Sequence, residues 1–220
     1  MFHHLYGILE RPPQASRLPD AGVDDRPVLV RPFANLVVLS TLLESIPRPS
    51  PRALSRHHEV QASVTVPGPL FPFAYGVSVP VGELEPWLAV RAGVVRAGLR
   101  AVRGHAEMHV SVLALHFGDG DPSRLCKVAD RVAEASGLTS WRSRISGRGG
   151  NATITLAFLV RRAEVAAFLA RIAPVASRAG DVAVVPSGPW PPATFVPSIE
   201  LPSRAVGPEA AAPVAVPYAV

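Results

Sequence analysis

The stretch HAEMHVSVLALH, His105–His116, alternates between two kinds of residue in the way that is typical of a β-strand. Because successive side chains of a strand point to opposite faces, the alternation separates an apolar face from a second face. The apolar face carries Ala106, Met108, Val110, Val112 and Ala114, and the second face carries His105, Glu107 and His109. The stretch therefore predicts a strand of a sheet that is covered on one side only.

The elements that follow this strand come in a regular order. Asp121-Pro122 is typical of a helix start and Gly137 of its end. Two strand patterns are joined by SGRGG, a hairpin signal, and are followed by a helical pattern and a closing strand. These segments are TSWRSRI, NATITLAFLV, RRAEVAAFLARIAPVASRAG and DVAVVP. The order β-α-β-β-α-β predicts an α+β fold with a ferredoxin-like, or split βαβ, sheet.

The same alternation predicts which side chains the helices of this sheet cover. We expect the covered face to hold Met108, Val110, Val112, Ile154, Leu156 and Phe158. The outward face should show His105, Glu107, His109, Thr153 and Thr155. A slip of one residue would exchange the two faces, so this assignment tests the register.

The N-terminal part has a less regular pattern. FHHLYGIL, VLV and ANLVVLS suit strands, a short helix is expected between Arg52 and Gln61, and PGPLFPFAYGVSVPVG suits edge strand and buried loop. A long helical pattern fills 82–104. We expect three parts: an α+β domain over 1–81, a helix plus ferredoxin-like domain over 82–197, and a disordered Ala/Pro-rich tail over 198–220.

The segment GPWPPATF, Gly188–Phe195, combines prolines with two large aromatic side chains. Proline fixes its own φ and pushes its predecessor toward extended geometry, so the segment should form a stiff extended arm. We expect Trp190 and Phe195 to be largely buried, with the arm packed on PGPLFPFAYG.

Composition sets limits on the function. The net charge is +5 and Lys127 is the only lysine, so the basic side chains are almost all arginines, which suit carboxylates and phosphates alike. Cys126 is alone, which excludes a disulfide framework. No leader sequence or long apolar run is evident, so we expect a cytosolic protein.

Two clusters contain residues that could bind a metal. His105, Glu107 and His109 form a ligand set known for non-haem iron, but alternate residues of one strand lie about 7 Å apart, too widely spaced to meet one ion. A polar outer face of a sheet is the better interpretation. His57, His58 and Glu59 lack the spacing of HExxH and suit a solvated helix end. With no catalytic motif found, we expect neither an enzyme nor a cofactor.

Arg142, Arg144 and Arg148 form a basic cluster on the predicted hairpin. An RNA-binding domain of this topology needs aromatic residues for base stacking, and NATITLAFLV has none on its outward face. Acidic protein and phosphate both remain open as partners of these arginines.

Several segments together resemble gas vesicle accessory proteins of the GvpL/GvpF type. HLYGIL resembles the family's "YLYGI" strand, and GHAEMHVSV resembles "GKxEMxVKV". HHEVQASVTVPGPLFPFAYGVSV resembles the "HE…VLPLRFGTVF" block. NATITLAFLV with GPWPPATFV resembles an "AFLV" strand followed by "GPWPPYSFV", the most specific signature. The matches run in the family order from residue 3 to about 196.

This sequence departs from the family pattern at several points. Ala74 stands where the family has arginine, and Ala193-Thr194 replaces Tyr-Ser. The lysine of the "GKxE" block is absent, and the stretch between Gly118 and Trp141 is short. A divergent member is therefore expected.

The resemblance implies a two-domain α+β protein whose second domain is a modified ferredoxin-like sheet with helices on one face. It implies a non-enzymatic gas vesicle protein, either an assembly factor or a minor structural component, located in the cytoplasm with the vesicle. Its expected partners are the main shell protein and other accessory proteins, with no nucleic acid or membrane. The alternative is an RNA- or anion-binding module that uses the arginine cluster. Structural roles are implied for Gly188, Pro189, Trp190, Pro191, Pro192, Phe195, Phe73, Tyr75, Gly76 and Glu107.

Overall fold

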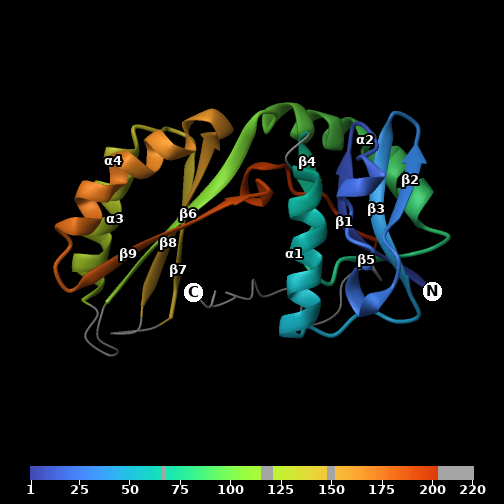
Figure 1. Ribbon diagram of the computed structural model, residues 1–220, viewed down its shortest axis with the longest axis horizontal. Coiled ribbons are helices and arrows are strands. Elements are labelled where there is room, and N and C mark those ends of the chain that lie inside the picture. Colours follow the sequence, from blue (N-terminus) through green and yellow to red (C-terminus); the bar gives the residue numbers. More distant parts are fainter. Residues whose placement is uncertain (66–67, 115–120, 148–151, 203–220) are drawn as a thin grey trace. The chain divides into compact units, whose positions relative to one another are not determined.

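A computed structural model of the protein describes residues 1–65, 68–114, 121–147 and 152–202. The fold mixes helices with two antiparallel sheets, so the α+β class is confirmed (Figure 1). The chain divides into two compact units. Unit 1 comprises 1–103 together with the described residues after 195, and unit 2 comprises 104–195. Among the described helices, none is long and apolar enough to cross a membrane.

Unit 1 is built on one antiparallel sheet. Its strands are β1 (Phe2–Leu9), β2 (Leu29–Phe33), β3 (Leu36–Leu43), β4 (Leu70–Pro72) and β5 (Ser78–Pro80). The strand order is β2-β3-β1-β4, and β5 also pairs with β1. Two 3₁₀ turns, η1 (Ala15–Arg17) and η2 (Val23–Asp25), precede β2.

Helices cover both faces of this sheet, with α1 (Pro51–Thr65) on one side and α2 (Leu84–Ala101) on the other (Figure 1). Leu36 and Val38 of β3 pack in the core that α2 closes, whereas Val37 and Leu39 pack in the core that α1 closes. A strand that is buried on both faces needs apolar residues on both, which explains the continuous run LVVL at 36–39.

The division of the chain differs from the predicted one at two points. The first unit was expected to end at 81, but α2 belongs to unit 1, because Leu84, Leu88 and Leu99 complete its core. The tail was expected from 198 onward, but Ile199 and Leu201 pack against the same core. The remainder of the predicted tail, 203–220, lies outside the described residues.

Unit 2 is built on a four-stranded sheet with two helices on one side (Figure 1). The strands are β6 (His105–Ala114), β7 (Trp141–Ser146), β8 (Thr153–Arg161) and β9 (Val182–Trp190), in the order β7-β8-β6-β9. The helices are α3 (Pro122–Ser136) and α4 (Val165–Ser177), and the short turns are η4 (Arg162–Glu164) and η5 (Ala193–Phe195). This is the β-α-β-β-α-β element order that the sequence predicts.

The predicted register of unit 2 is correct on its covered face. All six side chains expected there are buried with the helix residues Leu125, Val132 and Phe168: Met108, Val110, Val112, Ile154, Leu156 and Phe158. Thr153 and Thr155, on the opposite face, are only partly buried. The predicted ends of α3 are also correct, since Asp121 caps its first turn and Gly137 adopts a left-handed conformation.

Candidate functional site

Glu107 lies on the outward face of the unit 2 sheet and is nevertheless only 2% exposed. Burying a carboxylate costs free energy unless hydrogen bonds replace its water. The outer face of this strand is polar, as predicted, but a distant segment of the chain covers it at Glu107.

The covering segment is the end of the GPWPPATF motif. The Thr194 N–H donates to Glu107 Oε2 at 2.9 Å, and the Thr194 hydroxyl donates to Oε1 at 2.6 Å. His109 Nε2 also contacts Oε1, as a donor, because an ionised carboxylate can only accept. Three donors thus converge on one buried carboxylate. We call Glu107, His109 and Thr194 the Glu107 clamp.

Strand β9 reaches the clamp through an irregular step. Glu107 pairs with Trp190 and His109 pairs with Ser187, so β9 has one residue more than β6 in this interval. Gly188 sits in the bulge at φ 122°. A Cβ on Gly188 would lie 2.9 Å from the Glu107 carbonyl oxygen, so only glycine fits this close approach.

The prolines of the motif lie at positions where a missing backbone hydrogen bond to a neighbouring strand costs little free energy. β9 is an edge strand of the sheet, the position at which sheets tolerate proline. The Gly188–Pro189 peptide is cis, and Pro192, just before η5, is buried. The ladder continues to Trp190, so the predicted arm is in part an extension of the last strand.

Trp190 and Phe195 are both partly buried. The prediction that they are largely buried stays a prediction. The Trp190 Nε1–H donates to Ser187 Oγ at 3.4 Å, within its own strand. Phe195 lies beneath the Arg142 guanidinium, whose central carbon is 5.9 Å from the ring centre. The packing of this arm on PGPLFPFAYG stays a prediction.

The Thr194–Phe195 step crosses the sheet. Thr194 binds β6 through Glu107, whereas Phe195 meets β7 through Arg142, and β8 runs between these strands. Ala157 of β8 is opposite both His109 and Arg142 and is buried although it faces outward. The motif therefore covers part of the outward face and leaves the rest open.

Strand β7 forms the other edge of this sheet and is largely exposed. Arg142 and Arg144 project from its outward face beside Ala157 and Thr155, and Ile145 on the opposite face is 64% exposed. Among the described residues, Arg144 forms no ion pair. Arg148, the third member of the predicted cluster, lies outside the described residues.

A second polar cluster lies inside unit 1. His57 is only 1% exposed, so its assignment to a solvated helix end is wrong, because α1 is longer than predicted and turns His57 toward the sheet. His57 Nε2 is 3.0 Å from the Phe73 carbonyl oxygen, and His57 Nδ1 is 3.0 Å from His4 Nε2. The pair connects α1 to β1 and to residues 72–76, which we call the PFAYG segment.

The hydrogen-bond partners fix the tautomers of this pair. The Phe73 carbonyl can only accept, so His57 carries its hydrogen on Nε2, and a neutral His57 then accepts from His4 Nε2–H. Burial lowers the pKa of His57 to about 3, with the bond to Phe73 acting in the opposite direction. Burial likewise lowers the pKa of His4 well below 6.5. Both imidazoles are therefore neutral at pH 7.

The residues of the PFAYG segment have structural contacts. The Phe73 carbonyl also accepts from Gln61 Nε2 at 2.8 Å, and the Tyr75 hydroxyl donates to the Arg48 carbonyl at 2.9 Å. Gly76 has φ 88° in the turn closed by Val77 N–H and the Ala74 carbonyl. Ala74 is exposed at the tip of this turn.

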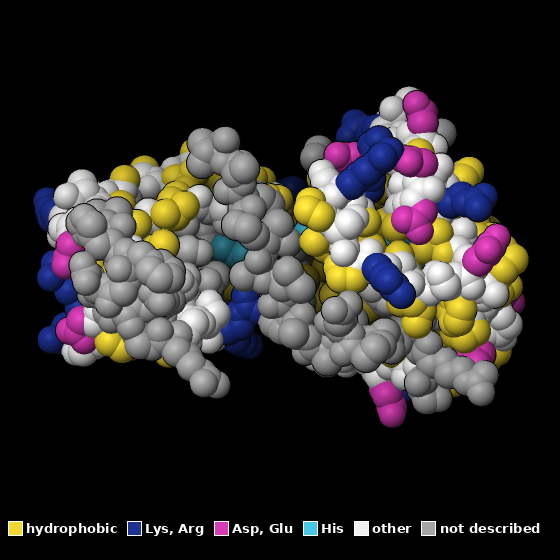
Figure 2. All heavy atoms as spheres, turned by 90° about the horizontal axis from the view of Figure 1, so that it is seen from below, with side chains coloured by type: hydrophobic (Ala, Val, Ile, Leu, Met, Phe, Trp, Pro, Cys, Tyr) yellow, Lys and Arg dark blue, Asp and Glu magenta, His cyan; other side chains and the backbone are white. Residues whose placement is uncertain are grey.

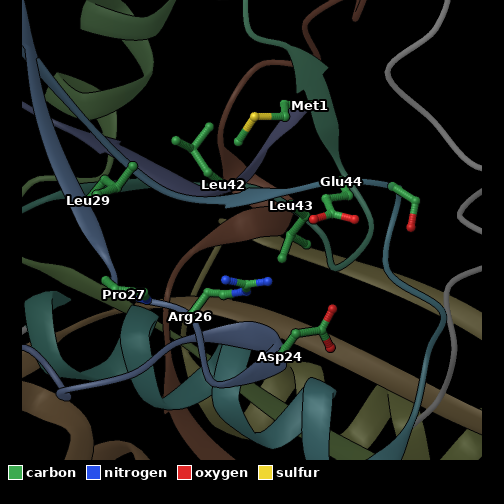
Figure 3. Close-up of a pocket in the computed structure, with 9 residues that line it drawn as sticks. Met1, Asp24, Arg26, Pro27, Leu29, Leu42, Leu43 and Glu44 are labelled. Carbon is green, nitrogen blue, oxygen red and sulfur yellow. The ribbon is translucent and has the colours of Figure 1, made fainter.

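The described residues contain an open pocket of about 530 Å³ at one end of the unit 1 sheet (Figure 3). Asp24, Arg26 and Glu44 supply mixed charges (Figure 3). The rest of the wall is apolar except for one serine, and it comprises Met1, Pro27, Leu29, Leu42, Leu43 and Ser45. No group of three or more His, Cys, Asp or Glu in the described parts of the chain could hold a metal ion.

Comparison with known structures identifies the same architecture elsewhere. The crystal structure of the gas vesicle protein GvpF from Anabaena sp. PCC7120 is similar with a TM-score of 0.72 and 15% identity, covering 91% of this chain and 98% of that chain. The crystal structure of gas vesicle protein GvpF from Microcystis aeruginosa is similar with a TM-score of 0.72 and 14% identity, covering 90% and 99%. At these identities the likeness establishes the fold alone.

A comparison with individually curated protein sequences found no match. A comparison with protein families found one whose description is gas vesicle synthesis protein GvpL/GvpF, and it matches residues 3–119 and 122–197. The match spans both units, including the β1 strand, the PFAYG turn, Glu107 and the GPWPPATF motif. This chain belongs to the gas vesicle synthesis protein GvpL/GvpF family.

Proposed function

We propose that this gas vesicle protein is a non-enzymatic assembly factor or minor structural component that associates with the main vesicle shell protein in the cytoplasm. Family membership supports a role in gas vesicles. The polar clusters support structure rather than chemistry. Both Glu107 oxygens accept hydrogen bonds from Thr194, and His57 is bonded through both ring nitrogens, to the Phe73 carbonyl and to His4. Other accessory proteins are further proposed partners, and no cofactor or nucleic acid is required.

The observation that carries this proposal is the exposed edge strand β7. Arg142 and Arg144 place positive charge on one of its faces, and Ile145 places an apolar side chain on the other. An apolar partner surface with acidic positions matches this combination. Arginine suits such a contact because its planar group binds carboxylates through two parallel hydrogen bonds.

We also propose that unit 2 is a modified ferredoxin-like domain. The element order and the placement of α3 and α4 on one face support this assignment. The modification is the extension of β9 by a bulge and by the segment that closes over Glu107. This segment covers the outward face over Glu107 and leaves the part beside β7 uncovered.

Charge reversal tests the proposed surface. The double variant Arg142→Glu/Arg144→Glu should co-purify with the shell protein at a small fraction of the parent level, with an unchanged circular dichroism spectrum. A matched control is Lys127→Glu/Arg131→Glu on α3, which changes the net charge equally at exposed positions of the same unit. Equal co-purification of the β7 variant and the parent would exclude this surface and direct the search for the contact to unit 1.

A salt titration separates shell binding from binding to RNA or another polyanion through the same arginines. Phosphate contacts weaken steeply with salt, whereas a contact that is largely apolar does not. On the coloured part of the face shown in Figure 2, arginine and acidic side chains are interspersed with apolar ones, unlike the single-sign stripe of a nucleic-acid binder. We expect co-purification with the shell protein to survive moderate salt.

A further inference from the structure

Helix α2 has an outward face with large apolar side chains in contact with solvent. Val90 is 80% exposed and Val94 is 43% exposed, although the opposite face of the helix is fully packed. The neighbouring outward positions are also uncharged and exposed: Pro86, Ala89, Gly93 and Ala97. A helix that packs on one sheet normally carries charged and polar residues on its other side. The face of α2 departs from that pattern.

The described residues of unit 1 leave this face open. The segment 196–202 lies along a flank of the helix, where Pro197 contacts Gly98 and the Glu200 backbone accepts from Trp87 Nε1 at 2.8 Å. A Cβ placed on Gly93 would meet no atom within 4 Å. The centre of the face is therefore both apolar and sterically free.

Opposite charges stand at the two ends of the same face. Glu85 lies in the first turn and Arg100 in the last turn. Arg100 has no ion pair among the described residues, and Glu85 has only a 4.0 Å contact with Arg31 between two exposed groups. At 1.5 Å rise per residue, Glu85 lies about 12 Å before Gly93 and Arg100 about 10.5 Å after it.

We propose that the face of α2 binds α2 of a second copy of this chain, antiparallel and centred near Gly93. Reversal about that centre brings Glu85 of each copy to the height of Arg100 of the other, within about 1.5 Å. Steps of 100° per residue place both side chains on the same side of the contact line, so they meet rather than diverge. The arrangement is isologous and forms two identical ion pairs.

The apolar positions fit the same register. Ala89 of one copy lies at the height of Ala97 of the other, on the two sides of the contact line, and Gly93 meets Gly93 at the centre. Small residues there allow the helix axes to approach to about 8 Å, the near end of the usual range. Val90 then covers Val94 of the second copy on the remaining side of the seam.

A second copy fits α2 better than it fits the exposed edge strand β7. Antiparallel pairing of two β7 strands would bring Arg142 and Arg144 against each other, and like charges across such a pair are destabilising. The face of α2 instead carries both signs at complementary heights.

One helix face buries a small area, so the association should be weak. Interfaces that bury less than about 1,200 Å² belong to transient contacts. Sedimentation velocity of the full chain should show a dimer at tens of micromolar protein that dissociates on dilution. A monomer throughout that range overturns the proposal.

Exchanging the charges of Glu85 and Arg100 tests whether the partner on α2 is a second copy of this chain. Glu85→Arg and Arg100→Glu should each weaken dimerisation about tenfold, which corresponds to about 1.4 kcal/mol. The double variant Glu85→Arg/Arg100→Glu restores both pairs and should regain the parent affinity. Failure of either single variant to weaken the dimer, or of the double variant to restore it, excludes this register.

Disulfide trapping tests the centre directly. In a Cys126→Ser background, Gly93→Cys should form a crosslinked dimer under mild oxidation. The control is Ala101→Cys on the same exposed helix, whose two copies would lie about 24 Å apart along the seam. Equal crosslinking of the two variants would indicate random collision and would overturn the proposal.

Discussion

Glu107 shows at the scale of one residue how a buried charge can hold two distant parts of a chain together. The carboxylate on β6 and Thr194 are 87 residues apart, and both Thr194 donors end on it. A hydrogen bond to a charged group contributes about 1.5–3 kcal/mol, and leaving such a group unpaired costs more than the bond contributes. The clamp therefore fixes the end of the GPWPPATF motif with few atoms.

The Thr194 hydroxyl can be tested separately from its bulk. Thr194→Val keeps the shape and removes the donor, so we expect the free energy of unfolding to fall by about 1–2 kcal/mol. Thr194→Ser keeps the donor and should stay within about 0.5 kcal/mol of the parent. Urea denaturation followed by tryptophan fluorescence measures both. Equal losses in the two variants would show that the methyl group, and not the hydroxyl, matters.

The buried His4–His57 pair predicts a pH dependence of stability. The folded pKa of His57, about 3, lies below the ordinary value of 6.5, so the unfolded chain binds more protons as the pH falls. The stabilising contribution is complete above pH 6.5 and is lost on acidification. Between pH 6.5 and 5, His57 alone should remove about 2 kcal/mol from the free energy of unfolding.

The variant His57→Gln isolates this effect. It lacks the titrating group, so its free energy of unfolding should fall less steeply than that of the parent between pH 6.5 and 5, whatever its stability at pH 7.5. Chemical denaturation at several pH values gives the comparison. Parallel profiles for the variant and the parent would assign the acid sensitivity to other groups.

Residue patterns predicted the faces of the strands but not the burial of single polar residues. Alternation placed Met108 inside and Glu107 outside correctly, yet it could not show that η5 folds over Glu107. The burial of His57 could not be predicted from the sequence pattern either, because it depends on a hydrogen bond to the Phe73 carbonyl of another segment.

At the scale of elements, the sequence predicted which helices and strands exist better than where they end. Periodicity identified β6, β8 and α3 nearly to the residue, because their apolar positions repeat cleanly and α3 has a capping residue at each end. Strand β9 runs four residues further than DVAVVP suggested, to Trp190. Prolines argue against a central strand, but at the edge of a sheet they are tolerated.

The bulge in β9 predicts a strict requirement for glycine. Gly188→Ala would put a Cβ 2.9 Å from both the Glu107 carbonyl oxygen and Met108 Sδ, at a φ that side chains rarely adopt. We expect a loss of about 1–3 kcal/mol. Gly82→Ala is the control, because its Cβ would meet nothing within 4 Å. Thermal melts compare the two, and a Gly188→Ala melt equal to the parent would show that β9 can shift away from β6.

At the scale of the whole molecule, the chain leaves unit 1 at 103 and returns to it at 196. Sequence patterns suggested a simple succession of domains because the return segment is short and has no period. Its contacts are specific all the same: Trp87 donates to the Glu200 backbone, and Arg91 pairs with the Glu200 carboxylate at 3.3 Å. Such long-range contacts form only in the folded unit, so no local sequence pattern predicts them.

Unit 2 is one continuous segment between the two segments of unit 1, and we predict that it folds without unit 1. Its core is drawn entirely from residues between Met108 and Val182, and the Glu107 clamp closes it within 104–195. A fragment 104–195 should therefore give a cooperative urea transition and dispersed amide signals in NMR spectra. A fragment 104–190 keeps every strand but leaves Glu107 without Thr194, so its free energy of unfolding should be lower by about 2 kcal/mol or more. A collapsed but non-cooperative 104–195 fragment would show that unit 2 needs unit 1 in order to fold. Equal stability of the two fragments would show that the clamp orders the motif without stabilising the domain.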